Sequence, residues 1–354
     1  MSPSGGTWDC TVTQQIQADP DFGGIGIIVA FVITACLALI AACFGLLLDL
    51  FDHVERLKSS GPFDKFLHAL YRLVPFYITL DARENARHVL HRLMRTISDQ
   101  QLVLGIALLA AGWLRLNTIT VYHFEMMTDL AWLSSSTHLL TVGYLEKTCF
   151  RDPRFRDWRV VAMCLNFVLL LVATVYTGHR DWFDLYGVPA RCLVDAVSAD
   201  PRVIGGYPAA MMGLWVAVLV YGYARGIVPL YPRLRTLLTP PFLSKHYPLQ
   251  RHSRSFLPCK LTTRIALAFR FLASWAWTVL AAQSFWFALG NYAVWTDRLY
   301  AQPRLRGDED VWGFAQLVPL FLLGLALART AEAWFGEYLS QFALLLGVGK
   351  RDLG

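Results

Sequence analysis

The stretch GIGIIVAFVITACLALIAACFGLLL, from Gly24 to Leu48, decides the fold class of this chain. It carries no charged residue, and as a helix it is long enough to cross a hydrocarbon core about 30 Å thick with some tilt. Backbone groups in lipid must be hydrogen-bonded within the segment, so we expect a helix. A cleaved signal peptide is the alternative, but the preceding residues contain no Lys or Arg and the apolar run is unusually long for one.

The composition of the whole chain is also typical of a membrane protein. Of its 354 residues, 55% are hydrophobic and 16% are charged, against roughly 45–50% and 25% in soluble domains. Six more apolar segments follow the first, at 102–121, 122–145, 160–177, 207–223, 265–294 and 312–328. We therefore predict an all-α bundle of seven transmembrane helices over residues 24–332. The net charge of +6 does not indicate nucleic-acid binding, because the basic residues lie in loops between the spans.

Basic residues are distributed unevenly between alternate loops. The set formed by segments 51–99, 146–159, 224–264 and the tail holds 23 Lys and Arg, whereas the alternate set holds six. Because basic loops stay in the cytoplasm, we expect the N-terminus (residues 1–23) outside and the C-terminus inside. The two long basic loops, 51–99 and 224–264, would face anionic lipid headgroups. The membrane itself, plasma membrane or endoplasmic reticulum, is left open.

Four further segments have helical or irregular patterns outside the spans. Residues 63–74 alternate apolar and polar faces as a surface helix would, and Asp81 with Glu84 has the spacing of a capped helix start. The 227–264 loop has six prolines and no acidic residue, so we expect it to be irregular. Residues 333–354 are predicted to form an interfacial amphipathic helix and a cytoplasmic tail, with an eighth span as the alternative.

The third span, YHFEMMTDLAWLSSSTHLLTVGYL (122–145), is unusually polar for a membrane segment. Glu125, Asp129, Trp132 and Ser136 share one helical face because they are four, three and four residues apart. A carboxylate at the centre of a bilayer costs about 2.5–3.5 kcal/mol even on insertion scales, so this face should meet the bundle interior, a partner or water. We take Glu125 and Asp129 as candidate catalytic acids. Candidate ligand-binding residues are His123, Trp132, Ser136, His138 and, on the sixth span, Trp286.

A purely structural role for these acids is the competing interpretation. Arg115, near the outer end of span two, would lie about level with the start of span three and within reach of Glu125. Arg329, in or near span seven, is the other possible partner. An ion pair of this kind would hold the bundle together without any ligand.

Motifs of soluble enzymes and metal sites are mostly absent. The sequence has no Walker A motif, no Gly-x-Ser-x-Gly elbow, no Cys-x-x-Cys and no aspartate-rich diphosphate motif, and we expect no cofactor. His88 and His91 are three residues apart, but no third ligand is near them, so two solvated histidines are favoured over a metal site. Cys10 and Cys192 both fall outside on this topology. They form a candidate disulfide, with free thiols as the alternative.

Several strings in the first 145 residues are distinctive. They are GGIG at 23–26, SDQQLV at 98–103, VYHF at 121–124 and LAWLSSSTHL at 130–139. Over residues 23–145 the chain resembles a family of uncharacterised multi-pass membrane proteins of filamentous fungi. The resemblance implies a fungal source and a membrane location. It transfers no catalytic role, because that family has no agreed activity, and the later spans show no comparable string.

These patterns favour a membrane protein that acts on a lipophilic small molecule. Proton-initiated cyclisation or isomerisation needs a protonated carboxylic acid in an apolar site and aromatic walls to stabilise a cation. Span three supplies acids and Trp132, and span six supplies further tryptophans, among them Trp286. A seven-span receptor or sensor of a lipophilic ligand, and a scaffold without catalytic activity, are the alternatives. The receptor analogy is weak because the motifs of seven-helix receptors and of retinal proteins are missing.

Overall fold

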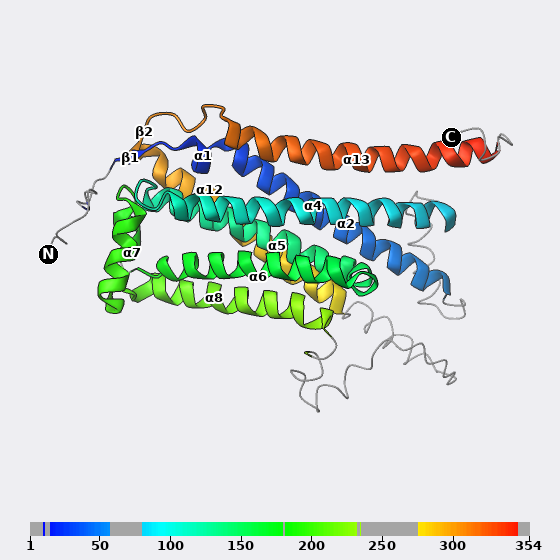
Figure 1. Cartoon of the computed structure of the whole chain (residues 1–354), viewed down its shortest axis with the longest axis horizontal. Coiled ribbons are helices and arrows are strands. Elements are labelled where there is room, and N and C mark those ends of the chain that lie inside the picture. The colour runs from blue at the N-terminus through cyan, green and yellow to red at the C-terminus, as the bar shows by residue number, and fades with distance from the viewer. Residues whose placement is uncertain are drawn as a thin grey trace, which may run out of the picture.

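The fold is a bundle of long helices with short connecting segments at one end (Figure 1). The structure is a computed structural model, and it describes Cys10 and residues 15–56, 80–179, 181–231, 234 and 275–345. The long helices of this described part are α2 (Ile25–Arg56), α4 (Leu80–Leu114), α5 (Val121–Arg151), α6 (Pro153–Tyr176), α8 (Gly206–Ile227), α12 (Trp275–Ala301) and α13 (Phe314–Leu345). The predicted all-α class is therefore confirmed.

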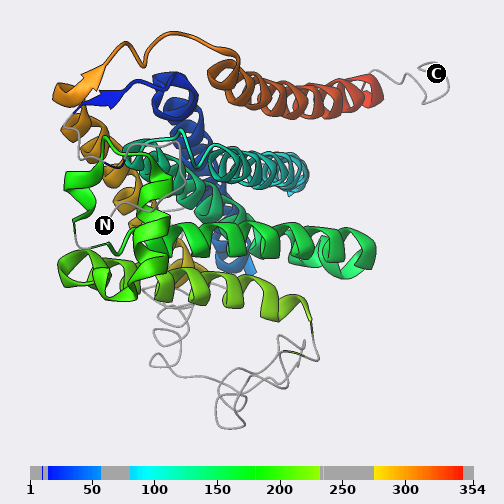
Figure 2. The same ribbon diagram turned by 60° about the vertical axis from the view of Figure 1, so that its left-hand side comes forward.

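Short elements gather at the end of the bundle where α2 begins, and we call this region the cap (residues 15–24, 181–205 and 302–313). Its elements are β1 (Ile16–Gln17), α1 (Pro20–Gly23), η1 (Trp182–Leu185), α7 (Ala190–Ala199), η2 (Pro201–Val203), η4 (Gln302–Arg304) and β2 (Leu305–Arg306). β1 and β2 pair in parallel, with Ile16 opposite Leu305 (Figure 2). The cap therefore joins the start of the chain to the connection between α12 and α13.

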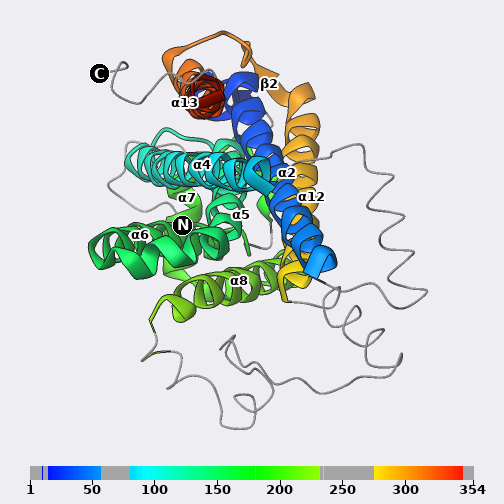
Figure 3. The ribbon, with the colours of Figure 1, turned by 90° about the vertical axis from the view of Figure 1, so that its right-hand side faces the viewer.

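The helix α5 occupies the centre of the bundle. It packs against α2, α4, α6, α8 and α12, and the end-on view shows it surrounded by these neighbours (Figure 3). Phe124, Met127 and Leu130 are fully buried in the main apolar core. Because so many neighbours surround α5, the side chains described on it, over residues 121–142, are buried or half-buried.

Local sequence fixes where two of the helices begin. Asp152 precedes α6, and its carboxylate accepts hydrogen bonds from the backbone N–H groups of Arg154 (3.1 Å) and Phe155 (3.2 Å). Pro153 occupies the first turn, where its missing N–H is not needed. Asp19 caps α1 in the same way by accepting from the N–H of Asp21. These caps satisfy donors that a helix start otherwise leaves unpaired.

Five helices of the described part are long and apolar enough to cross a membrane. They are Pro20–Asp49, Arg83–Leu114, Pro153–Tyr176, Gly206–Leu230 and Phe314–Gly336. On α6 the exposed residues Val161, Leu165, Val168 and Val172 recur four, three and four residues apart, so one outer face of this helix is an apolar stripe. A stripe of this kind suits contact with lipid. The predicted third and sixth spans coincide with α5 and with the described part of α12, and neither helix is one of these five.

Two predicted boundaries differ from the structure. The predicted second span continued to residue 121, but α4 ends at Leu114 and a turn precedes α5. The helix predicted from Asp81 is not separate from that span, because α4 runs unbroken from Leu80. Similarly, α13 continues without a break to Leu345, so the stretch expected as an interfacial helix extends the last long helix. The predicted surface helix at 63–74 and almost all of the basic loop at 227–264 lie outside the described residues.

Candidate functional site

A cavity of about 60 Å³ lies between α5, α6, α8 and α12. The acids Glu125 and Asp129 line it together with three tryptophans, several hydroxyl groups and small or apolar residues. The full lining is Glu125, Thr128, Asp129, Trp132, Leu133, Ser136, Thr174, Thr177, Trp215, Trp286, Gly290 and Ala293. By the standard of roughly 10–15 Å³ for one water, the cavity has room for about four or five non-hydrogen atoms.

One face of α5 forms a wall of this cavity. Glu125, Asp129, Trp132 and Ser136 all line it, as their shared helical face suggests. The row extends about 16 Å along the helix axis, at 1.5 Å per residue. Trp286, on α12, lies in the opposite wall. The structure thus brings five of the seven candidate site residues of the third and sixth spans to one place.

Tyr186 connects the cap to these acids. Its hydroxyl group donates to Oε2 of Glu125 at 2.5 Å, and lies 3.4 Å from Oδ1 of Asp297. Burial raises the pKa of the Tyr186 phenol well above its ordinary value, and the neighbouring carboxyl groups of Glu125 and Asp297 raise it further. The phenol therefore stays protonated and acts as a donor, which suits an ionised acceptor at Glu125.

Asp129 lies against a third acid, Asp297 of α12. Their carboxyl groups lie close enough to interact electrostatically. Two neighbouring buried carboxyl groups disfavour double ionisation, so we expect one proton to remain on the pair. Oδ2 of Asp129 is fully buried and accepts no hydrogen bond from an N–H or O–H group of the described residues. The pair therefore places an acidic proton beside the cavity.

Asp297 and Tyr186 were not among the residues predicted from the sequence. A signal for Asp297 exists, because Trp286, Gly290, Ala293 and Asp297 are four, three and four residues apart, the same spacing as the row on α5. Two facing helices carry matching rows, and both rows end in acids near the cap. Tyr186 lies between η1 and α7. No periodic pattern could have identified it.

Three tryptophans form the aromatic side of the cavity. The ring centroids of Trp132 and Trp215 are 5.0 Å apart, and those of Trp215 and Trp286 are 5.6 Å apart. Because Trp132, Trp215 and Trp286 come from α5, α8 and α12, the cluster depends on the packing of three helices. Trp215 was not predicted as a site residue. It has no polar neighbours in sequence to distinguish it from a lipid-facing tryptophan.

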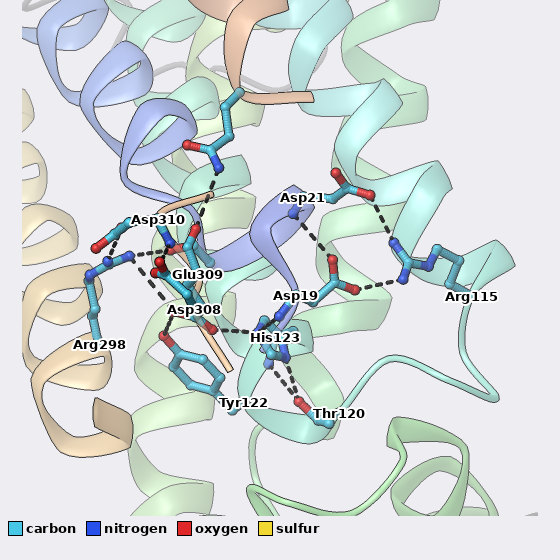
Figure 4. A network of polar contacts seen from close by, with 12 residues as sticks. Asp19, Asp21, Arg115, Thr120, Tyr122, His123, Arg298, Asp308, Glu309 and Asp310 are labelled. Atoms are coloured by element: carbon cyan, nitrogen blue, oxygen red, sulfur yellow. Dashed lines mark hydrogen bonds and ion pairs between the residues drawn. The ribbon is translucent and has the colours of Figure 1, made fainter. Parts of the chain in front are cut away.

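His123 lies in the cap network of Figure 4 and does not line the cavity. Its Nδ1 is 2.7 Å from Oγ1 of Thr120, and its Nε2 is 2.7 Å from Oε1 of Glu309 and 3.2 Å from the backbone nitrogen of Asp19. The side chains of His123 and Glu309 are 1% and 2% exposed. The hydroxyl of Tyr122 also donates to Glu309, at 3.4 Å. This histidine therefore joins α5 to two of the three parts of the cap, residues 15–24 and 302–313.

Arg298 is the buried cation of the same network. Its guanidinium lies 3.8 Å from Glu309 and 2.6 Å from Asp310, and it donates to the backbone carbonyl of Gly23. Arg298 therefore contacts both the start of the chain and the connection before α13. Figure 4 shows its side chain directed toward Glu309 and Asp310.

Arg115 does not pair with Glu125, and this corrects the expected ion pair. It lies after the end of α4, and its guanidinium bonds Asp19 at 2.6 Å and Asp21 at 3.4 Å. The turn carries Arg115 toward the cap, where the N-terminal segment supplies closer carboxylates. Arg329 pairs instead with Glu332 on its own helix, at 3.6 Å. Neither Arg115 nor Arg329, the two proposed partners, therefore forms an ion pair with the acids on α5.

His138 belongs to a second buried network, further along α5. Its Nε2 is 3.0 Å from the hydroxyl of Tyr223, which in turn contacts Asn166 (2.8 Å) and Ser135 (3.1 Å). All four side chains are buried. His138 therefore connects α5 to α6 and α8, and it does not line the cavity.

The cysteines and the histidine pair can also be placed. Cys10 and Cys192 form a disulfide with their Cα atoms 5.8 Å apart, which joins the N-terminal segment to α7. His88 and His91 lie on α4. Within the described part of the chain, no three His, Cys, Asp or Glu side chains are grouped so that they could hold a metal ion.

Comparison with known proteins gives one informative match. The chain is 25% identical over 122 residues to a protein described as "Elsinochromes biosynthesis cluster protein HP3" from Elsinoe fawcettii. The matched part is 34% of this chain and 44% of that protein, so less than half of the relative is covered. No protein-family model and no solved structure matches the chain. The relative fits the fungal source that the resemblance implies.

Proposed function

We propose that this chain is an integral membrane protein with seven spans, its cap outside and its C-terminus in the cytoplasm. In the described part of the chain, successive long helices run alternately away from the cap and toward it (Figure 1). This alternation and the apolar stripe on α6 support the arrangement. The asymmetry of 23 against six basic residues supports the orientation. A disulfide in the cap suits an oxidising compartment. The basic loops 51–99 and 224–264 would then face anionic headgroups, as part of the same proposal.

Within this bundle, we propose that the cavity carries out acid–base conversion of a lipophilic metabolite. The observation that carries the proposal is the gathering of three acids at one cavity: Glu125 and Asp129 line it, and Asp297 shares the hydroxyl of Tyr186 with Glu125. Acids grouped in a buried site with aromatic walls should retain a proton that can be given to a substrate. Transfer of that proton to a carbon–carbon double bond would start a cyclisation or isomerisation. The tryptophans would stabilise the resulting cation, and a carboxylate of the same cluster would remove a proton at the end.

This reaction is balanced without a further reactant. The acid pair gives one proton, the cluster receives one proton back, and the product has the composition of the substrate. The relative named as a biosynthesis cluster protein makes a role in a metabolite pathway the appropriate setting. The proposal does not require the activity of that relative to be the same.

The test uses deuterium as a label for carbon protonation. Membranes containing the wild-type protein are incubated in D2O with a lipid extract of the source organism, and products are analysed by mass spectrometry. We expect a compound whose mass rises by one unit through deuterium on carbon. Asp129→Asn should abolish this labelling because the amide keeps the shape but cannot supply a carboxyl proton. Glu332→Gln, which changes an exposed acid on α13, is the matched control and should leave labelling unchanged.

Folding is monitored in the same samples. If Asp129→Asn keeps the wild-type amount and unfolding temperature but loses labelling, the acid acts in the reaction. If the wild-type protein gives no labelled product, the acid–base proposal is wrong. Retention of an extract compound without turnover would then favour a receptor or sensor, and no retention would favour a scaffold.

A further inference from the structure

We infer that the cavity between α5, α6, α8 and α12 recognises positive charge, so that its ligand carries an organic ammonium group or develops a cation at that position. The inference rests on the proposed function in using the same cavity. It goes further because it names the charge of the ligand. Two features of the cavity carry it, the aromatic walls and the sign of the polar groups.

The aromatic walls suit a cation of low charge density. Trp132, Trp215 and Trp286 line one cavity, and neighbouring ring centroids are 5.0 and 5.6 Å apart. A cation within about 6 Å of an indole face is attracted by the ring quadrupole, and tryptophan gives the strongest interaction of the aromatic side chains. Tryptophans also suit neutral apolar ligands, so the walls alone do not decide the charge.

The polar lining decides it. Two carboxylic acids line the cavity, and no Lys, Arg or His of the described residues is among the lining residues. Asp297 adds a third acid, because the Tyr186 hydroxyl that bonds Glu125 also lies 3.4 Å from Oδ1 of Asp297. The neighbouring Arg298 does not neutralise this group, because its guanidinium bonds Asp310 and the carbonyl of Gly23 in the cap.

Glu125 is the acid whose hydrogen bonding best suits a negative charge. The hydroxyl of Tyr186 donates to it at 2.5 Å, a bond that an ionised carboxylate makes strongly. The same hydroxyl lies 3.4 Å from Oδ1 of Asp297. A cationic ligand beside these carboxyl groups favours their ionised form and pairs with it, whereas a neutral ligand leaves a buried charge without a counter-ion.

The volume sets the size of the charged group. Space for about four or five non-hydrogen atoms suits a trimethylammonium group. The lining hydroxyl groups of Thr128, Ser136, Thr174 and Thr177 donate to backbone carbonyls of their own helices. Within the described residues, no three His, Cys, Asp or Glu side chains are grouped as a metal ion would require. We therefore assign the site to an alkylated ammonium rather than to an inorganic ion.

The test compares two probes of equal shape. Tetramethylammonium and tert-butanol each have five non-hydrogen atoms in a branched arrangement, but the central atom is a cationic nitrogen in the first and a neutral carbon in the second. Binding is measured by calorimetry with the full-length protein in nanodiscs of neutral lipid, and empty nanodiscs serve as the blank. We expect the cation to bind at least 10-fold more tightly than the neutral compound after the blank is subtracted.

Variants assign the effect to the cavity. Glu125→Gln should weaken cation binding at least 10-fold, and Trp215→Leu at least 3-fold, while binding of the neutral compound changes less than 2-fold. Glu332→Gln and Trp158→Leu change an exposed acid and an exposed tryptophan, and neither should alter cation binding. The comparison of the two probes on the wild-type protein needs no variant, so a variant that fails to fold does not prevent the test.

Two results overturn the inference. One is equal or tighter binding of tert-butanol, and the other is cation binding that persists unchanged in folded Glu125→Gln and Trp215→Leu proteins. Failure here is distinct from failure of the proposed function. Deuterium labelling with no preference for the cation rejects only the charge assignment, whereas cation preference without labelling rejects only the reaction.

Discussion

Replacing Arg298 by methionine tests whether the buried network of the cap holds the ends of the bundle together. Methionine retains most of the apolar length of the side chain but removes the guanidinium that faces Glu309 at 3.8 Å. At an effective dielectric constant of about 20, a pair at this distance interacts by about 4 kcal/mol. Side-chain exposures of 8% and 2% mean that the variant leaves the carboxyl group of Glu309 buried without this guanidinium.

We expect Arg298→Met to lower the free energy of unfolding by about 3–5 kcal/mol, the usual cost of breaking a buried ion pair. For a chain of 354 residues this corresponds to a drop of roughly 5 °C in the unfolding temperature, by the unfolding entropy of globular proteins. The assay is thermal unfolding in a non-ionic detergent, followed by tryptophan fluorescence. Adding Glu309→Gln should restore part of the loss, because the uncompensated charge is then removed.

Arg329→Met is the matched control. Arg329 and Glu332 are 3.6 Å apart, a similar distance, but their side chains are 70% and 69% exposed. Solvent screening should limit this loss to about 0–1 kcal/mol. Equal drops in unfolding temperature for Arg298→Met and Arg329→Met, or no rescue by Glu309→Gln, would refute the conclusion that burial gives the Arg298 pair its importance.

Three further predictions follow from other parts of the molecule. For topology, a reporter fused after Gly354 should be cytoplasmic and a tag before Trp8 should be accessible on intact cells, because of the 23-to-six basic asymmetry; both termini on one side would mean a different number of spans. For the disulfide, Cys10 and Cys192 should resist alkylation until a reductant is added, and modification of both in untreated protein would exclude the bridge. For packing, Gly105→Ala should destabilise the protein by about 1–3 kcal/mol, because its Cβ would lie 2.5 Å from Oγ of Ser134. Gly213→Ala should not destabilise the protein, because a Cβ at this position meets only open space. Equal thermal stability of the two variants would contradict this packing argument.

Periodicity in the sequence was sufficient to locate the helices and one wall of the cavity. An uncharged run such as 24–48 has few structural alternatives, and the spacing of Glu125, Asp129, Trp132 and Ser136 requires a common face in any helix. These are local properties, and a single helix determines them. The structure accordingly has α2 and α5 where they were predicted.

Contacts between distant segments could not be predicted in this way. Arg115 was expected beside Glu125 because both lie near the same turn, but Asp19 and Asp21 reach it from 96 and 94 residues away in the sequence. His123 and His138 share α5 with the acids but point to Glu309 and Tyr223, on other segments. Tyr186 reaches Glu125 from a short non-helical connection. Which face of α5 meets which neighbour is decided by packing of the whole bundle.

The disulfide of the cap also has a consequence for how the protein is made. Cys10 is synthesised 182 residues before its partner Cys192. At about 5–20 residues per second, the first thiol waits on the order of 10–40 s before the second emerges. During that interval the N-terminal segment has neither α7 nor the still later strand β2 to bind, although α2 is already complete. We expect the cap to close as one of the last steps of biosynthesis, after the cavity beneath it has been assembled around α5.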